Sequence, residues 1–165
     1  MSRLVPLALA ILAFSPPLHA QVADTDPQVR AAVTYFDLDG GATSAPAAEV
    51  TFLGKEPRVW RASLMAGALA STHGQVYIYG GLHLPIQLPL GLLARPSFSV
   101  GLYEKGSGRE LGNPLEFRSS LAIERMVGDR FRALLFVYHL SNAGLGFTNP
   151  GLEALGLGLS FPLGR

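Results

Sequence analysis

The 165-residue sequence contains no cysteine and only two lysines, and only 15% of its residues are charged. The absence of cysteine excludes structural disulfides and thiolate metal sites. Thirteen basic residues offset twelve acidic ones, and the formal net charge of +1 gives no electrostatic footprint for nucleic acid. With 48% hydrophobic residues, the chain is too apolar for a disordered protein. One compact domain is therefore expected.

Long hydrophobic runs are also scarce, and the run near the N-terminus is short. A positively charged start precedes the apolar residues 4–14, and a small-residue cleavage site ends at Ala20. We therefore expect residues 1–20 to be a secretory signal peptide and residues 21–165 to form a single domain. The alternative is an N-terminal anchor helix, but Pro16-Pro17 ends the apolar run well short of membrane-spanning length.

The rest of the sequence alternates with a period of two residues and keeps no helical period for long. Alternation of this kind predicts β-strands, whose successive side chains point to opposite faces. Clusters of glycine, proline, asparagine and aspartate separate the runs, as expected for turns. Eight strands are predicted, over residues 28–37, 47–53, 58–71, 74–84, 92–103, 115–126, 131–141 and 153–162.

The last of these runs indicates the surroundings of the strands. Leucines and a phenylalanine occupy one face of residues 153–162, and only alanine, glycine and serine occupy the other. A soluble sandwich would carry polar residues on its outer face, whereas small residues fit the interior of a narrow barrel whose outer face meets lipid. The prediction is an all-β fold, an eight-stranded antiparallel transmembrane β-barrel of the bacterial outer membrane. A secreted, soluble lipid-binding barrel is the alternative.

Three polar side chains interrupt the apolar faces near the end of the chain. His139 and Ser141 share the outward face of the run 131–141, and Glu153 shares the outward face of the last run. Strands that follow one another in sequence are usually neighbours, and all three residues fall at the extracellular end of their strands. Ionisable groups at a hydrocarbon boundary are costly, which makes them candidates for function.

Serine, histidine and a carboxylate are the three parts of a hydrolytic triad. In such a triad His139 would take the proton of Ser141, and Glu153 would hold the imidazole in the required tautomer. The outer leaflet at this depth consists of lipopolysaccharide, so an acyl ester of lipid A is the substrate that an outward-facing serine would meet. The alternative is a non-catalytic structural or adhesion barrel in which these residues are ordinary interfacial groups.

Two motifs surround these residues, HLSNAGL from His139 to Leu145 and NPGLE, which ends at Glu153, twelve residues after Ser141. Together with the upstream segment GNPLEFRS, which begins at Gly112, they resemble the PagL-type lipid A 3-O-deacylases. The resemblance implies an outer-membrane serine esterase that removes the 3-hydroxyacyl chain ester-linked at position 3 of lipid A. It implies His139 as base, Ser141 as nucleophile and Glu153 as the orienting acid.

The resemblance also assigns further parts of the site and the partners. It associates Asn142 with the oxyanion site, and the backbone N–H groups of Ala143 and Gly144 are further candidate donors. It implies lipopolysaccharide and outer-membrane lipid as partners, with no metal, cofactor or nucleic acid, and leaves a homodimer open. In a chain with so few lysines, Arg109 and Arg132 are the candidates for contacts with the lipid A phosphates.

Overall fold

The computed structural model describes residues 26–55 and 62–164. The expected signal peptide, residues 1–20, lies outside them, as does the beginning of the strand expected at 58–71. The part described contains almost the whole of the expected barrel domain.

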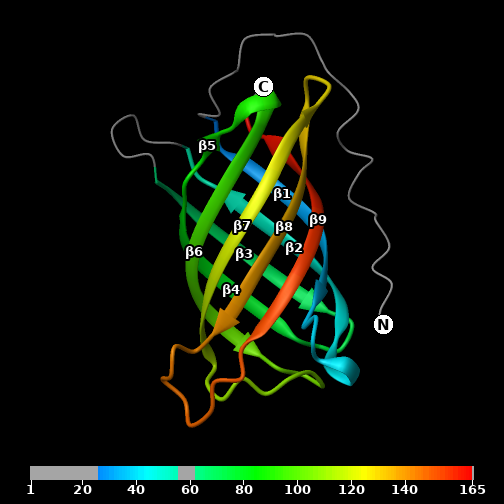
Figure 1. Cartoon of the computed structure of the whole chain (residues 1–165), viewed down its shortest axis with the longest axis vertical. Coiled ribbons are helices and arrows are strands. Elements are labelled where there is room, and N and C mark those ends of the chain that lie inside the picture. The colour runs from blue at the N-terminus through cyan, green and yellow to red at the C-terminus, as the bar shows by residue number, and fades with distance from the viewer. Residues whose placement is uncertain (1–25, 56–61, 165) are drawn as a thin grey trace.

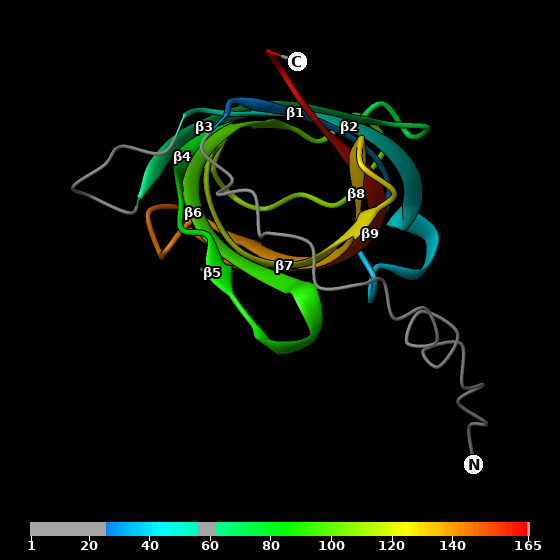
Figure 2. The same cartoon turned by 90° about the horizontal axis from the view of Figure 1, so that it is seen from above.

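Within the described residues, nine strands form one antiparallel sheet that closes on itself (Figures 1 and 2). They are β1 (Gln28–Phe36), β2 (Ala45–Leu53), β3 (Ser63–Ser71), β4 (Val76–His83), β5 (Ile86–Gln87), β6 (Leu92–Glu104), β7 (Leu115–Val127), β8 (Phe131–Ser141) and β9 (Leu152–Pro162). Two single-turn 3-10 helices, η2 (Gly41–Thr43) and η3 (Pro89–Gly91), lie in connections. No helix in the described residues is long and apolar enough to span a membrane.

The barrel wall consists of eight of these strands, as the sequence predicts. Strands adjacent in the chain pair with each other, and the pairings β1–β9 and β4–β6 close the ring. The short strand β5 is an addition that the sequence analysis read as part of a turn. It forms because Ile86 and Gln87 fold back against Ala94 and Leu93 at the start of β6.

The two faces of the wall differ as the alternation predicts. On β9, Leu157 is exposed, whereas its neighbour Gly156 is buried. The ring of Phe136, opposite Gly156 on β8, packs so closely that a Cβ at Gly156 would lie 2.2 Å from it. The small residues of β9 therefore make room for the aromatic side chains that fill the barrel.

Paired charges fill the interior together with these aromatic rings. Arg118 lies with its Nη1 atom 2.7 Å from Oε1 of Glu49. Its guanidinium carbon lies 4.6 Å from the ring centroid of Tyr79 and 3.8 Å from that of Tyr138. All four side chains are buried. Buried charges need such partners, so the interior is a packed polar core.

The two ends of the barrel carry different connections (Figure 1). Residues 37–44, 72–75, 105–114 and 142–151 connect strands at one end, which we call the long-loop end. The connections 84–91 and 128–130, the start of β1 and the end of β9 lie at the other. Outer-membrane barrels have longer extracellular loops and short periplasmic turns, so the long-loop end is the extracellular one.

Candidate functional site

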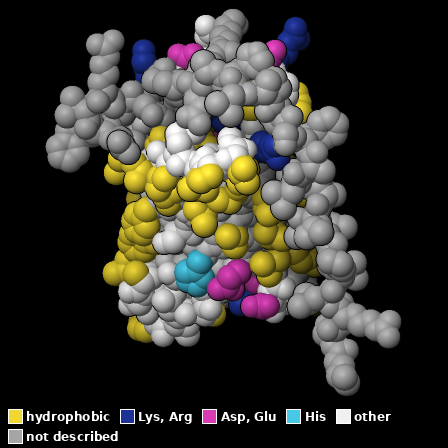
Figure 3. Space-filling model, turned by 45° about the horizontal axis from the view of Figure 1, so that its top comes forward, with side chains coloured by type: hydrophobic (Ala, Val, Ile, Leu, Met, Phe, Trp, Pro, Cys, Tyr) yellow, Lys and Arg dark blue, Asp and Glu magenta, His cyan; other side chains and the backbone are white. Residues whose placement is uncertain are grey.

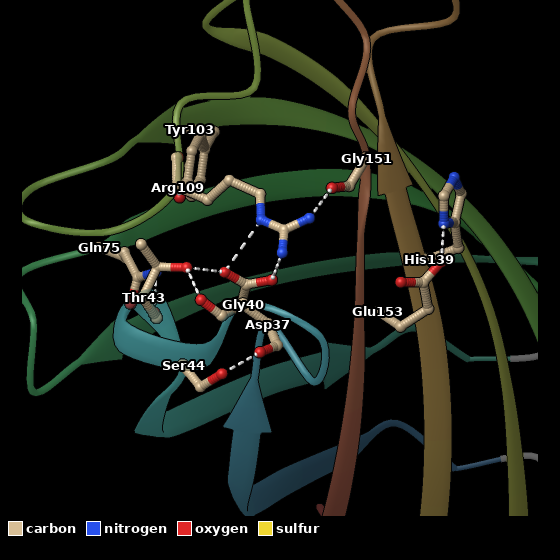
Figure 4. A network of polar contacts seen from close by, with 10 residues as sticks. All are labelled: Asp37, Gly40, Thr43, Ser44, Gln75, Tyr103, Arg109, His139, Gly151 and Glu153. Carbon is tan, nitrogen blue, oxygen red and sulfur yellow. Dashed lines mark hydrogen bonds and ion pairs between the residues drawn. The ribbon is translucent and has the colours of Figure 1, made fainter.

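A histidine and a glutamate meet on the outer wall at the long-loop end. His139 on β8 and Glu153 on β9 are directly opposite each other in the antiparallel register. The Nδ1 atom of His139 lies 2.9 Å from Oε1 of Glu153, and the two side chains are 49% and 46% exposed (Figure 4). Figure 3 shows a histidine beside acidic side chains at the margin of the hydrophobic band. Both groups therefore lie outside the barrel, where the sequence analysis placed them.

This contact determines which nitrogen of His139 is available for proton transfer. An ionised carboxylate only accepts hydrogen bonds, so Nδ1 carries the proton and donates it to Glu153. The lone pair of Nε2 is then free to accept a proton, and Nε2 has no hydrogen-bond partner in the described part of the chain. A carboxylate in this position also stabilises the imidazolium that forms after proton transfer.

Ser141 is the last residue of β8 and lies two residues beyond His139 on the same face. Its side chain is half-buried, and its hydroxyl makes no hydrogen bond to the residues that the structure describes. The structure thus brings His139 and Glu153 into contact and places Ser141 two residues from His139 on the same face of β8.

A second serine, Ser119, lies beside His139, and the sequence alone does not indicate this proximity. Ser119 on β7 is directly opposite His139 in the register, on the side away from Glu153, and its side chain is exposed. Strand pairing between β7 and β8 produces this juxtaposition. The twenty residues that separate the two positions hide it from a motif search.

A tight turn follows Ser141. The φ angles of Ala143 and Gly144 are 53° and 80°, and the N–H of Leu145 donates to the carbonyl oxygen of Asn142 at 3.0 Å. Two positive φ angles in a row are typical of a type I′ turn. Left-handed backbone is easy for glycine but costs an alanine roughly 1 kcal/mol. The turn therefore holds strained backbone directly after the candidate nucleophile.

Asn142 is fully buried and holds this turn in place. Its side-chain nitrogen donates to the carbonyl oxygens of Leu111 at 2.6 Å and Thr148 at 2.8 Å, and its Oδ1 accepts the N–H of Gly144 at 2.9 Å. The amide of Asn142 and the N–H of Gly144 are thus engaged within the protein. Of the three expected oxyanion groups, Ala143 is the one whose N–H has no partner among the described residues.

A polar network in the mouth of the barrel supports the start of β9 (Figure 4). Arg109 and the buried Asp37 form an ion pair with Nη2···Oδ1 at 3.0 Å and Nε···Oδ2 at 3.1 Å. The Nη1 atom of Arg109 donates to the carbonyl oxygen of Gly151 at 3.2 Å, and the Thr43 hydroxyl donates to Asp37. The sequence makes Arg109 a candidate for contacts with the lipid A phosphates. All three nitrogens of its guanidinium instead have partners within the protein.

The same loop carries a second ion pair, which is exposed to solvent. The Nζ atom of Lys105 lies 2.9 Å from Oε2 of Glu110. This hydrogen bond lowers the pKa of the Glu110 carboxyl and raises the pKa of the Lys105 ammonium. Exposed pairs of this kind contribute little to stability. The described residues contain no cluster of three or more histidine, aspartate or glutamate side chains that could hold a metal ion.

Comparison with solved structures shows what kind of barrel this is. The chain is similar to the structure titled "Crystal structure of the outer membrane enzyme PagL", with a TM-score of 0.63 and 17% identity over 82% of this chain and 99% of that one. It is also similar to two designed transmembrane barrels, each with a TM-score of 0.59, at 10% and 11% identity. These matches cover 84% and 86% of this chain and 96% of each design. Identities this low show the fold alone.

A comparison with models of protein families identifies the family to which the chain belongs. The family model described as "Lipid A 3-O-deacylase (PagL)" matches residues 47–162, a range that contains His139, Ser141 and Glu153. A search of the curated proteins gives no match. The family match covers most of the chain and extends from β2 to the end of β9, on a barrel of the transmembrane type. The chain therefore belongs to the PagL family of lipid A 3-O-deacylases and is a β-barrel of the outer membrane.

Proposed function

We propose that this protein is a serine esterase that hydrolyses the 3-hydroxyacyl ester at position 3 of lipid A, with Ser141 as nucleophile, His139 as base and Glu153 as orienting acid. The observation that carries the proposal is the contact between His139 and Glu153 on the lipid-facing wall. An ionisable pair is costly at the margin of a lipid belt, and Ser141 on the same face supplies the hydroxyl that the pair would activate. Membership of a family of lipid A 3-O-deacylases indicates which ester would be the substrate.

These positions support the following reaction. Ser141 Oγ attacks the ester carbonyl carbon while Nε2 of His139 takes the hydroxyl proton. His139 then protonates the departing sugar oxygen, and the acyl group remains on Ser141. A water molecule, deprotonated by His139, attacks this acyl-enzyme and releases the 3-hydroxy fatty acid. Glu153 keeps its hydrogen bond to Nδ1 throughout and stabilises each imidazolium.

The turn after Ser141 is the proposed oxyanion site. The N–H of Ala143 is available, and backbone donors next to the nucleophile stabilise the negative charge of a tetrahedral intermediate. Asn142 and Gly144 belong to the same site through the turn that they build, because their hydrogen bond shapes the backbone on either side of Ala143.

The wall next to the site suits an acyl chain. Leu135 and Val137 precede His139 on the outward face of β8, and Leu155 and Leu157 follow Glu153 on β9, and all four are exposed. A lipid A molecule in the outer leaflet would lay its chains along these residues and present its ester linkages near the long-loop end. The substrate therefore has no need to leave the membrane.

The test is the mass spectrum of lipid A from cells that express the protein. The wild type is expected to remove one 3-hydroxyacyl chain, and Ser141→Ala and His139→Asn are expected to leave lipid A intact. Ser119→Ala is the matched control, because Ser119 is equally a neighbour of His139 and should be dispensable. Deacylation by Ser141→Ala together with its loss in Ser119→Ala would reassign the nucleophile. Unmodified lipid A in cells with folded wild-type protein would refute the proposed activity.

A further inference from the structure

We propose that Asp37 and Arg109 are positioning residues, which hold the external site in place from inside the barrel mouth. They fix the backbone of Gly151, on which the imidazole of His139 rests, and so maintain the contact between His139 and Glu153. This inference rests on the proposed esterase function and adds residues that neither touch the substrate nor belong to the triad.

The imidazole of His139 packs on Gly151. A Cβ at Gly151 would lie 2.8 Å from Cε1 of His139 and 3.1 Å from the carbonyl oxygen of Leu140. The ring therefore lies directly against the Gly151 backbone, whose φ angle of 62° is a left-handed conformation that favours glycine. A displacement of Gly151 would displace the ring.

The backbone of Gly151 is attached in turn to the rest of the molecule. Arg109 bonds the Gly151 carbonyl and is itself held by Asp37 through two nitrogens, an arrangement that fixes the guanidinium in direction as well as distance. Leu38, which follows Asp37 in the chain, donates its N–H to the carbonyl oxygen of Glu153 at 2.8 Å. The residues that follow β1 thus hold the start of β9 at two points, at Gly151 through Arg109 and at Glu153 through Leu38. Figure 4 shows the first of these two attachments.

The contact between His139 and Glu153 on the outer wall is weak by itself. The side chains of His139 and Glu153 are about half exposed, and exposed ion pairs are held only loosely by their own attraction. Asp37, in contrast, is fully buried. The buried network therefore supplies the rigidity that the exposed pair lacks, and displacement of a reacting group by an ångström can lower a rate about 10²-fold.

The test compares Arg109→Met and Arg109→Lys with Lys105→Met. Lys105→Met also removes one cation and one ion pair from the same loop, but that pair has no connection to Gly151. Deacylation of purified lipid A is measured in detergent–phospholipid micelles, per folded barrel, with folding read from heat-modifiable migration on gels. Arg109→Met should lower kcat roughly 10- to 100-fold with little change in KM. Arg109→Lys should recover part of the lost kcat, because lysine keeps the positive charge but lacks the planar guanidinium that donates several hydrogen bonds at once.

A second readout measures serine activation without lipid A. An alkyl fluorophosphonate forms an Oγ–phosphorus bond with Ser141, expels fluoride and leaves the hydroxyl proton on His139. Arg109→Met should slow this labelling in parallel with kcat. Wild-type kcat and labelling rates in folded Arg109→Met would overturn the positioning role and leave the esterase intact. Failure of the esterase itself would be recognised by a wild-type protein that neither deacylates lipid A nor takes up the label.

A different observation carries a second inference, at the opposite end of the barrel. We propose that residues 84–91 form a wedge that inserts into the periplasmic phospholipid leaflet. This segment, LPIQLPLG, contains β5 and η3 and has no charged residue. Figure 2 shows it looping away from the barrel wall. Ile86 is 41% and Leu90 78% exposed, and the wall strands on either side continue the apolar surface with Leu82 and Phe98.

The backbone of the segment supports the same assignment. Leu90 has a φ angle of 63°, which is a left-handed conformation rarely adopted by leucine, and Gly91 follows at 71°. A leucine in this position pays for its strained backbone and, if it faces water, also for its exposed apolar side chain. Insertion into hydrocarbon would remove the second of these costs. Apolarity is not general at this end, because the connection 128–130 reads Gly-Asp-Arg. Exposed apolar side chains at a membrane margin match a lipid surface.

The absence of cysteine from the chain makes the test direct. Leu90→Cys and Asp129→Cys are folded separately into phospholipid vesicles and treated with a charged, water-soluble maleimide. Both positions are exposed at the same end of the barrel and face the same compartment. The thiol of Leu90→Cys should react roughly tenfold more slowly than that of Asp129→Cys, and the difference should vanish in urea. Equal rates in vesicles would overturn the wedge.

Discussion

At the scale of single residues, Gly151 links backbone conformation to the candidate chemistry. Gly151→Ala adds a methyl group where His139 Cε1 would be 2.8 Å away and strains a backbone with a φ angle of 62°. We expect a fall in deacylation of about 10²-fold, because the imidazole must move from its contact with Glu153. The rate is measured per folded barrel on purified lipid A.

The chain offers a control with the same backbone strain. Gly128 has a φ angle of 61°, but a Cβ there would meet nothing within 4 Å, and it lies in the turn 128–130 at the other end of the barrel. Gly128→Ala should therefore reproduce the strain and leave turnover unchanged. Equal turnover in both variants would show that His139 does not depend on the space above Gly151.

At the scale of elements, the turn after β8 depends on one buried amide. Asn142→Ala removes the donors to the carbonyl oxygens of Leu111 and Thr148 and the acceptor for Gly144. Each buried backbone group left unpaired costs about 1–3 kcal/mol, so we expect the loop 142–151 to lose its order and deacylation to fall. Limited proteolysis measures the order of the loop, and mass spectrometry of lipid A measures deacylation.

Asn113→Ala provides the comparison for this turn. Asn113 accepts a single hydrogen bond, from the N–H of Leu115, in the loop 105–114. Its replacement should leave protease resistance of the loop 142–151 and lipid A deacylation unchanged. A turn that keeps its protease resistance in Asn142→Ala would mean that Asn142 is dispensable for its shape.

The sequence predicts those elements and residues whose neighbours are set by alternation. Period-two patterning is enough to find all eight wall strands and to place His139 and Glu153 outside, because side-chain direction in a strand follows from position alone. Contacts made by loops cannot be predicted in this way. Arg109 and Asp37 are 72 residues apart, and Asn142 and Leu111 are 31 apart, with no periodic pattern to connect them. Those partners become visible only after the barrel has closed.

At the scale of the whole molecule, stability depends on charges that never meet solvent. Arg118→Met leaves Glu49 buried without its cation, and breaking one side of a buried pair typically costs about 3–5 kcal/mol. The double variant Glu49→Gln/Arg118→Met removes both charges and should recover part of that loss. Urea unfolding in detergent micelles, followed by heat-modifiable migration, gives the comparison. A double variant less stable than Arg118→Met would contradict this account.

The stacked rings and paired charges of the interior have a consequence for the cell as well. Arg118, which packs against the rings of Tyr79 and Tyr138, occupies the interior of the barrel. The part of the barrel that the structure describes therefore offers no channel through which ions or small antibiotics could pass. Current recordings across a planar bilayer should accordingly show no conductance. A bacterium can then display many copies of such a protein and remodel its surface without opening a leak in its permeability barrier.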